Sequence, residues 1–192
     1  MRLDVIELKE FYYGTELGQT TKELINKILD KKINTETDSL TVGFGFACPF
    51  LESKIKDNDD KNFLLLMPNE QGVVSWPNKS KSVTALVDEV SWPVNTSAAD
   101  LILISHGLEV SDNQDLLLQE VLRVLKDSGK LVILVPNRTG FWARSDSTPF
   151  GYGKPYSISQ LTALLRKNQF QIESITPSLY GFPAKKGYWL KS

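Results

Sequence analysis

Short apolar runs, each ended by a turn-forming, polar or charged residue, recur along the chain from residue 40 onward. They cover residues 40–42, 63–67, 83–87, 101–104 and 131–135. Because the runs are continuous rather than alternating, we expect strands that are covered on both faces, as in a parallel sheet. A further strand is predicted over residues 170–175.

Helical periodicity fills the first part of the chain. Residues 4–33 are predicted to be helical, with Gly14 and Gly18 dividing the run and Thr20 or Thr21 as an N-cap. The apolar positions at helical spacing in this segment are Leu24, Ile25, Ile28 and Leu29.

Two more helices are predicted between and after the later strands. One covers residues 113–126 and is expected to end at Gly129, a residue that favours helix C-termini. The other covers residues 157–167, with Ser157 or Ser159 as its cap. It is expected to bury Leu161, Leu164 and Leu165.

This alternation of strands and helices predicts a three-layer α/β architecture. A length of 192 residues is that of one domain. Residues 1–38 would form an N-terminal helical cap, and residues 39–192 the sheet core. The charged segment 52–62 is expected to be a surface connection.

Charge and cysteine content exclude several classes of protein. A net charge of −1 provides no long-range attraction for nucleic acid or an anionic membrane. Cys48 is the only cysteine, which excludes an internal disulfide, and a single histidine disfavours a metal site. The acidic residues Asp4 and Glu7 stand where a signal peptide would need an apolar run. No segment approaches the ~18 consecutive apolar residues that a membrane-spanning helix needs. We therefore expect a cytoplasmic protein without a metal.

A glycine-rich turn, Gly43-Phe44-Gly45, follows the first predicted strand of the sheet. At that place glycines let the backbone approach a cofactor, although a tight turn alone would also need them. A dinucleotide fingerprint would need a third glycine where Cys48 stands, and an acid near Met67, where Glu70 is the nearest. An NAD(P)-dependent oxidoreductase is therefore disfavoured.

Several separate motifs follow one another between residues 84 and 137. They occupy residues 88–94, 99–109, 118–126, 129–133 and 136–138. In this order and spacing they resemble the second half of class I S-adenosylmethionine-dependent methyltransferases of the methyltransferase type 11 group. The resemblance extends over roughly residues 40–175, and the whole chain, including segments 67–72 and 148–151, also resembles a bacterial branch of that group.

The resemblance implies a Rossmann-like fold with a mostly parallel sheet of seven strands, which binds S-adenosylmethionine at the carboxyl ends of its first strands. Asp88, with Glu89 beside it, would match the acid that holds the adenine amino group. Ser105 and His106 would lie beside the methionine part of the cofactor or at the substrate entrance. The candidate cofactor-binding residues are Tyr12, Gly43, Phe44, Gly45, Met67, Pro68, Asp88, Glu89 and Ser105. On this assignment, Gly43→Val or Asp88→Ala would abolish cofactor binding and leave the fold intact.

The chain departs from the family pattern at three places. Thr41 stands where an acid usually precedes the first glycine, and Ala47 replaces the third glycine. Met67 and Pro68 replace the acid that normally holds both ribose hydroxyls. Losing that charge-assisted hydrogen bond would weaken binding by ~1.5–3 kcal/mol unless Glu70 or backbone groups compensate.

His106 is the candidate catalytic residue, because histidine alone has an unperturbed pKa near neutrality. It would act as a base where the methyl acceptor loses a proton, or it would hold a loop by hydrogen bonds. Tyr12 would cover the cofactor pocket and attract the sulfonium by a cation–π contact. The alternative is that Tyr12 only packs the N-terminal helix onto the sheet.

A long loop over residues 138–156 mixes aromatic and basic side chains. Loops of this length in a compact domain are usually functional or disordered. Arg138, Trp142 and Arg144 are therefore the candidate acceptor-binding residues, the alternative being a proline-rich crossing that packs over the sheet.

Two hypotheses of function follow. The first is methyl transfer from S-adenosylmethionine to an unidentified small-molecule or protein acceptor. The second is a methyltransferase fold without turnover that serves as a binding or scaffold protein. Residues 187–192 come too early for a comfortable seventh strand, so we also expect a sheet edge that is open to a partner.

Overall fold

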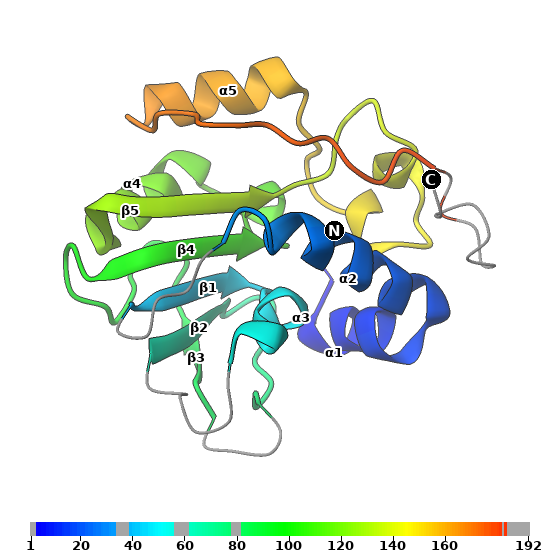
Figure 1. The fold of residues 1–192 in the computed structure, drawn as a ribbon, viewed down its shortest axis with the longest axis horizontal. Helices are drawn as coiled ribbons and strands as arrows, with labels where there is room; N and C mark the ends of the chain where they lie inside the picture. The colour runs from blue at the N-terminus through cyan, green and yellow to red at the C-terminus, as the bar shows by residue number, and fades with distance from the viewer. Residues whose placement is uncertain (1–2, 34–38, 56–61, 78–81, 182, 184–192) are drawn as a thin grey trace.

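Five parallel strands form one sheet in the computed structural model, which describes residues 3–33, 39–55, 62–77, 82–181 and 183 (Figure 1). Their order across the sheet is β3-β2-β1-β4-β5. The strands are β1 (Thr41–Gly45), β2 (Phe63–Pro68), β3 (Thr84–Val87), β4 (Ala99–Ser105) and β5 (Leu125–Leu134). The three-layer, Rossmann-like α/β class is therefore confirmed.

The first face of the sheet is covered by the N-terminal helices. Their bounds are α1 (Val5–Lys9), the π-helical turn η1 (Glu10–Gly14), α2 (Glu16–Leu29), α3 (Cys48–Leu51) and the 3₁₀ turn η2 (Glu52–Lys54). In α2 the buried residues Leu17, Thr21, Ile25 and Leu29 recur every four positions, which places them on one side of the helix. Figure 1 shows α1 and α2 beyond the arrowheads of the strands, at the carboxyl edge of the sheet.

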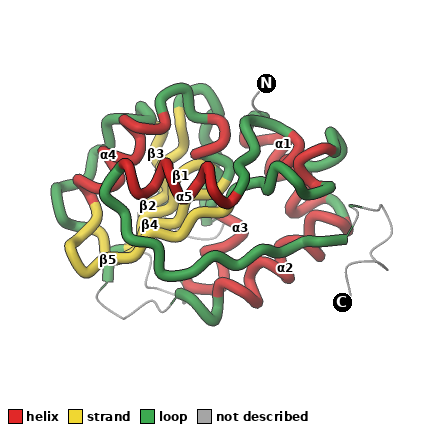
Figure 2. The backbone as a smooth tube through the Cα atoms, turned by 90° about the horizontal axis from the view of Figure 1, so that it is seen from above, coloured by secondary structure: helices red, strands yellow, loops and turns green. Residues whose placement is uncertain are grey.

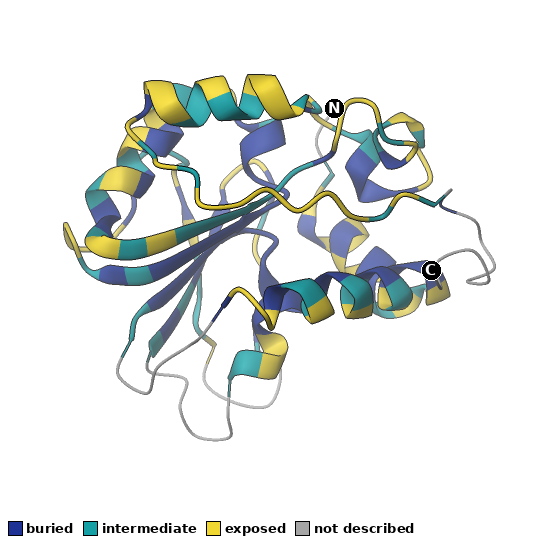
Figure 3. Cartoon of the chain, turned by 45° about the horizontal axis from the view of Figure 1, so that its top comes forward, coloured by how far each residue is buried: buried dark blue, intermediate teal, exposed yellow. Residues whose placement is uncertain are grey.

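The second face is covered by α4 (Gln114–Val124) and α5 (Ile158–Lys167). In α4 the buried stripe is Leu117, Leu118, Val121 and Val124. Helix α5 has no fully buried residue, and Leu161, Leu164 and Leu165 are only half-buried. Figure 3 shows this contrast, with α5 mostly exposed and the strands β1 and β4 largely buried, and Figure 2 shows α5 crossing above the sheet.

Short 3₁₀ turns join these elements at the carboxyl edge. They are η4 (Leu108–Val110), η5 (Trp142–Arg144) and η6 (Pro149–Gly151). The turns η5 and η6 lie in the long loop predicted over residues 138–156.

The N-terminal capping residues differ from the prediction. Asp4 caps α1 and forms a capping box with Glu7, and Thr15 caps α2. Thr20 and Thr21 lie inside α2 instead, where their hydroxyls donate to the carbonyls of residues 16 and 17. Gly14 does separate two helical segments, whereas Gly18 lies within the first turn of α2.

Two later predictions are also wrong. Gly129 ends no helix, because α4 already stops at Val124 and Gly129 lies within β5, where a Cβ would come 2.8 Å from Leu125 Cδ1. Residues 170–175 form no strand and follow α5 as an extended, mostly exposed segment. The predicted cap of α5 at Ser157 is confirmed, with Gln160 completing a capping box.

Residues 187–192, on which the expectation about a seventh strand rests, lie outside the described residues. Within the described ranges, no helix is long and apolar enough to cross a membrane. The same part of the chain contains no cluster of three or more His, Cys, Asp or Glu side chains that could hold a metal ion.

Candidate functional site

The turn after β1 closes tightly against the end of β4. Gly45 has a φ of 75°, and Phe46 N donates a hydrogen bond to Ser105 O at 2.7 Å. A Cβ on Gly45 would lie only 2.3 Å from the same carbonyl oxygen. Glycine is therefore required here both by backbone conformation and by the close approach of β4.

His106 follows β4 directly and lies in the left-handed region, with a φ of 50°. Its side chain is buried, and its carbonyl oxygen accepts a hydrogen bond from Gln71 Nε2 at 3.0 Å. A non-glycine residue in this conformation costs of order 1–3 kcal/mol, so the surrounding contacts must hold it there.

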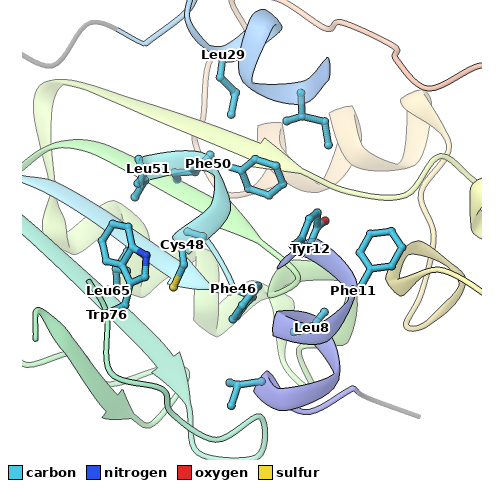
Figure 4. Close-up of a cluster of buried hydrophobic side chains, with 14 of the residues drawn as sticks. Leu8, Phe11, Tyr12, Leu29, Phe46, Cys48, Phe50, Leu51, Leu65 and Trp76 are labelled. Atoms are coloured by element: carbon cyan, nitrogen blue, oxygen red, sulfur yellow. The ribbon is translucent and has the colours of Figure 1, made fainter. Parts of the chain in front are cut away.

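The η1 turn brings Tyr12 onto this histidine. Tyr12 Oη lies 2.7 Å from His106 Nε2, and the tyrosine ring is fully buried. Figure 4 shows Tyr12 among Phe11, Phe46 and Phe50, with ring centroids 5.0, 6.2 and 5.4 Å away. Burial, and to a smaller extent the charge of Glu109, raises the pKa of Tyr12 well above its ordinary value, so the phenol keeps its proton.

Glu109 approaches the other ring nitrogen of His106. Its Oε1 lies 3.3 Å from Nδ1, and the carboxylate is almost completely buried. Glu109 Oε2 and Gln71 Oε1 are buried without a hydrogen-bond partner among the described residues. Both residues line a cavity of about 10 Å³ together with His106 and Tyr152, close to the volume that one water molecule needs.

The candidate residues after β3 do not join this cluster. Asp88 is exposed, and its Oδ1 accepts from Val90 N at 2.9 Å within a local turn. Glu89 Oε1 lies 3.2 Å from both Ser111 Oγ and Asp112 N, so its carboxylate ties the end of β3 to the start of α4. Both carboxylates therefore serve local structure in this arrangement.

Four other candidate residues pack within the core. Gly43 is buried inside β1, where a Cβ would lie 2.4 Å from Leu65 Cδ2. A Gly43→Val variant would therefore disturb the fold, contrary to the expectation that the fold would stay intact. Phe44 stacks on Trp92 at 4.9 Å, and Met67 and Pro68 are buried at the end of β2.

The loop residues predicted to bind an acceptor are divided. Trp142 is buried, its Nε1 donates to Gly181 O at 2.8 Å, and its ring packs edge-on against Phe150. Arg138 and Arg144 are exposed. Next to Arg138 lies an open hollow of about 480 Å³. Its lining consists of Asn137, Thr139, Ser157, Ile158, Ser159 and Thr162, none of which is suited to acid–base chemistry at neutral pH.

Of the candidate residues, Tyr12, Gly45, Ser105 and His106 are thus brought together at one end of the sheet. Sequence reasoning assigned no role to Glu109 or Gln71, although both lie inside the quoted motif segments. The three-residue spacing between His106 and Glu109 was the signal in the sequence that could have identified Glu109. Nothing in the sequence indicated that Phe150, which follows the last residue of β4 by 45 positions, would lie 5.1 Å from the His106 ring.

Comparison with known families and structures adds an independent line of information. The family model described as a methyltransferase domain matches residues 27–175. Among curated proteins, no sequence matches the chain.

Several solved structures share the fold at low sequence identity. One is a SAM-dependent methyltransferase from Thermotoga maritima, described as a possible histamine N-methyltransferase: its TM-score is 0.67 at 16% identity, over 88% of this chain and 78% of that one. A SAM-dependent methyltransferase from Archaeoglobus fulgidus has a TM-score of 0.63 at 20% identity, over 88% and 75%. One from Aquifex aeolicus has a TM-score of 0.55 at 14% identity, over 80% and 83%.

Proposed function

The chain belongs to the methyltransferase domain family, and on that premise we propose that it transfers a methyl group from S-adenosylmethionine to an acceptor. The observation that carries this proposal is the match of the methyltransferase domain model to residues 27–175. At the carboxyl edge of the sheet, the buried residue His106 lies beside the glycine turn. His106 would take the proton that the acceptor loses.

The described residues do not fit the cofactor in their present arrangement. Ligand pockets of this kind measure about 300–1,000 Å³, whereas the cavity beside His106 measures about 10 Å³. Tyr12 and Phe46 fill the space beyond the ends of β1 and β4. The carboxylate expected to hold the ribose is absent, since buried Met67 and Pro68 occupy that place.

The proposal therefore includes a movement of the N-terminal cover, by which we mean residues 5–14 of α1 and η1. Among the described residues, the hydrogen bonds that hold it at the edge are those of Val5 N to Gln71 O, at 2.9 Å, and of Tyr12 Oη with His106 Nε2, and its apolar side chains are buried in the core. A cofactor that binds only when the cover is displaced has an apparent affinity reduced by the fraction of open molecules. Loosening the cover should then tighten binding.

The test is calorimetric titration of S-adenosylmethionine and S-adenosylhomocysteine into the wild type, Tyr12→Phe and Tyr180→Phe. We expect micromolar binding by the wild type, ~−8 kcal/mol. Tyr12→Phe keeps the ring but loses the bond to His106, so binding should tighten roughly 2- to 10-fold. Tyr180 is exposed, and its variant serves as the matched control that leaves affinity unchanged.

The second candidate function is a methyltransferase fold without turnover that binds a partner. The filled carboxyl edge and the missing ribose carboxylate favour it. Failure of all three proteins to bind either ligand at millimolar concentration would select this alternative and reject methyl transfer.

A further inference from the structure

The His106 ring is held at both nitrogens by buried side chains. Nε2 lies 2.7 Å from Tyr12 Oη, and Nδ1 lies 3.3 Å from Glu109 Oε1. The exposed fractions are 0% for Tyr12, 4% for His106 and 2% for Glu109. All three polar groups are therefore removed from water, where electrostatic interactions are strong.

The backbone on either side of His106 is arranged so that Glu109 reaches the ring. The positive φ of His106 and the η4 turn fold the chain back within three residues. Lys154 N donates to Glu109 O at 2.7 Å, which fixes the backbone of the glutamate. Gln71 Nε2 fixes the backbone of the histidine in the same way.

The carboxylate of Glu109 is buried beside the imidazole of His106. Among the described side chains, His106 is the only basic group within 4.0 Å of it. One oxygen faces Nδ1 and the other remains unpaired. Burying a carboxylate is costly, and in most sites a cation offsets that cost. Here the imidazole of His106 is the group whose proton the Glu109 carboxylate attracts.

Electrostatics decides which tautomer this arrangement favours. If the proton is on Nδ1, an N–H dipole faces the carboxylate, and Nε2 accepts a hydrogen bond from the Tyr12 hydroxyl. If the proton is on Nε2, the Nδ1 lone pair faces the negative charge of Glu109 and is repelled. The first arrangement satisfies both contacts, and the second satisfies only one.

We propose that Glu109 is the positioning residue that keeps the proton of neutral His106 on Nδ1, so that Nε2 presents its lone pair to the proton to be removed. In this structure that lone pair receives the Tyr12 hydroxyl, which occupies the position that an acceptor hydroxyl or amine would take once the N-terminal cover moves. The role as a base rests on the proposed function, whereas the tautomer does not. The proton that the acceptor loses would move to Nε2 of His106.

The single histidine of the chain makes the tautomer directly measurable, because a ¹⁵N-histidine-labelled sample contains one imidazole. In the wild type, at a pH where the ring is neutral, we expect the nitrogen spectrum of the Nδ1–H form. In Glu109→Gln the amide can donate to Nδ1, so the signals should move toward the Nε2–H form. Glu109→Asp keeps the charge and should retain the wild-type tautomer.

Tyr12→Phe separates the two neighbours of the ring. It removes the partner of Nε2 and leaves the carboxylate, so the Nδ1–H form should persist. If the amide spectrum of Glu109→Gln shows that this variant does not fold, the tautomer in Tyr12→Phe decides the test. An Nε2–H form in the wild type, an unchanged tautomer in folded Glu109→Gln, or a reversed tautomer in Tyr12→Phe would each overturn the proposal.

Failure of the proposed function has a different signature. If no cofactor binds, the titration of S-adenosylmethionine is flat, while the nitrogen spectrum still reports the tautomer. If the cofactor binds, Glu109→Gln should bind it like the wild type and lose turnover.

Discussion

At the residue scale, two of the glycines with positive φ near the candidate site differ in what surrounds them. Gly45 has a φ of 75° and Gly72 a φ of 85°, so an alanine at either position is strained by a similar amount. A Cβ on Gly45 would lie 2.3 Å from Ser105 O, whereas on Gly72 it would meet only Val5 Cγ2, at an ordinary 3.6 Å.

Alanine substitutions at these glycines should therefore differ in cost. Gly72→Ala should lose only the conformational term, ~1–2 kcal/mol of the free energy of unfolding. Gly45→Ala must also separate β1 from β4 and should lose at least ~2 kcal/mol more. Urea unfolding measures both values. Equal losses would show that the close approach of β4 contributes nothing.

At the element scale, Thr15 joins two helical segments. Its hydroxyl donates to Phe11 O at 2.7 Å and accepts from Gly18 N at 3.0 Å, so it ends η1 and caps α2 with one oxygen. The segment that carries Tyr12 is thereby fixed to a helix that packs on the sheet.

Removing this cap should destabilise the protein by ~1–2 kcal/mol in Thr15→Ala. Thr20→Ala is the matched control, because Thr20 lies inside α2 and donates only to Glu16 O. Alanine favours helix interiors, so this control should be neutral or slightly stabilising. Thermal unfolding of both variants tests the pair, and a larger loss in Thr20→Ala would contradict the assignment of the cap.

Most elements were predictable from the sequence, because their signals are local. The apolar runs predicted β1, β2, β3 and β4 and the last four residues of β5, and the serine cap predicted the start of α5. The first part of β5 was not predicted, because residues 125 and 126 had been assigned to the preceding helix. Thr20 was misassigned as a cap because threonine also occurs within helices, where its hydroxyl bonds to the preceding turn. Residues 170–175 have the composition of a strand, but pairing depends on a neighbouring edge, which no local pattern reports.

The site was less predictable. His106 and Tyr12 were candidates, but their contact spans 94 residues of sequence and leaves no trace in either segment. Phe44 and Met67 match the positions of cofactor-binding residues in the family, yet they face the hydrophobic core in this chain. A motif position fixes where a residue lies along a strand, whereas its partners depend on how the remaining elements pack.

At the scale of the whole molecule, two ion pairs connect distant parts of the second face. Glu120 accepts from Arg123 and from Trp92 N, and Asp100 accepts from Lys126 and from Leu40 N. The Arg123 guanidinium lowers the pKa of Glu120, and the Lys126 ammonium lowers that of Asp100. These pairs link the loop after β3 to α4, and the start of β1 to β5.

Stability should therefore fall in acid. Both carboxyl groups have a lower pKa in the folded state than in the unfolded state, so their contribution is complete above the unfolded values, about 4. It is lost as the pH decreases through the folded values. Urea unfolding between pH 6 and pH 2.5 should show a smaller decrease in Glu120→Gln and in Arg123→Met than in the wild type. Parallel curves for all three proteins would rule out this pair as a source of acid sensitivity.

The contact between Tyr12 and His106 also has a consequence for biosynthesis. The N-terminal cover is synthesised before residues 71 and 106, to which it is hydrogen-bonded in the folded protein. At ~5–20 residues per second, roughly 5 to 20 s separate the synthesis of Tyr12 from that of His106. Until β4 has emerged, the apolar side chains of the cover have no sheet to pack against and are available to a chaperone. The segment that closes the carboxyl edge is thus synthesised before β4 but can pack in place only after β4 has formed.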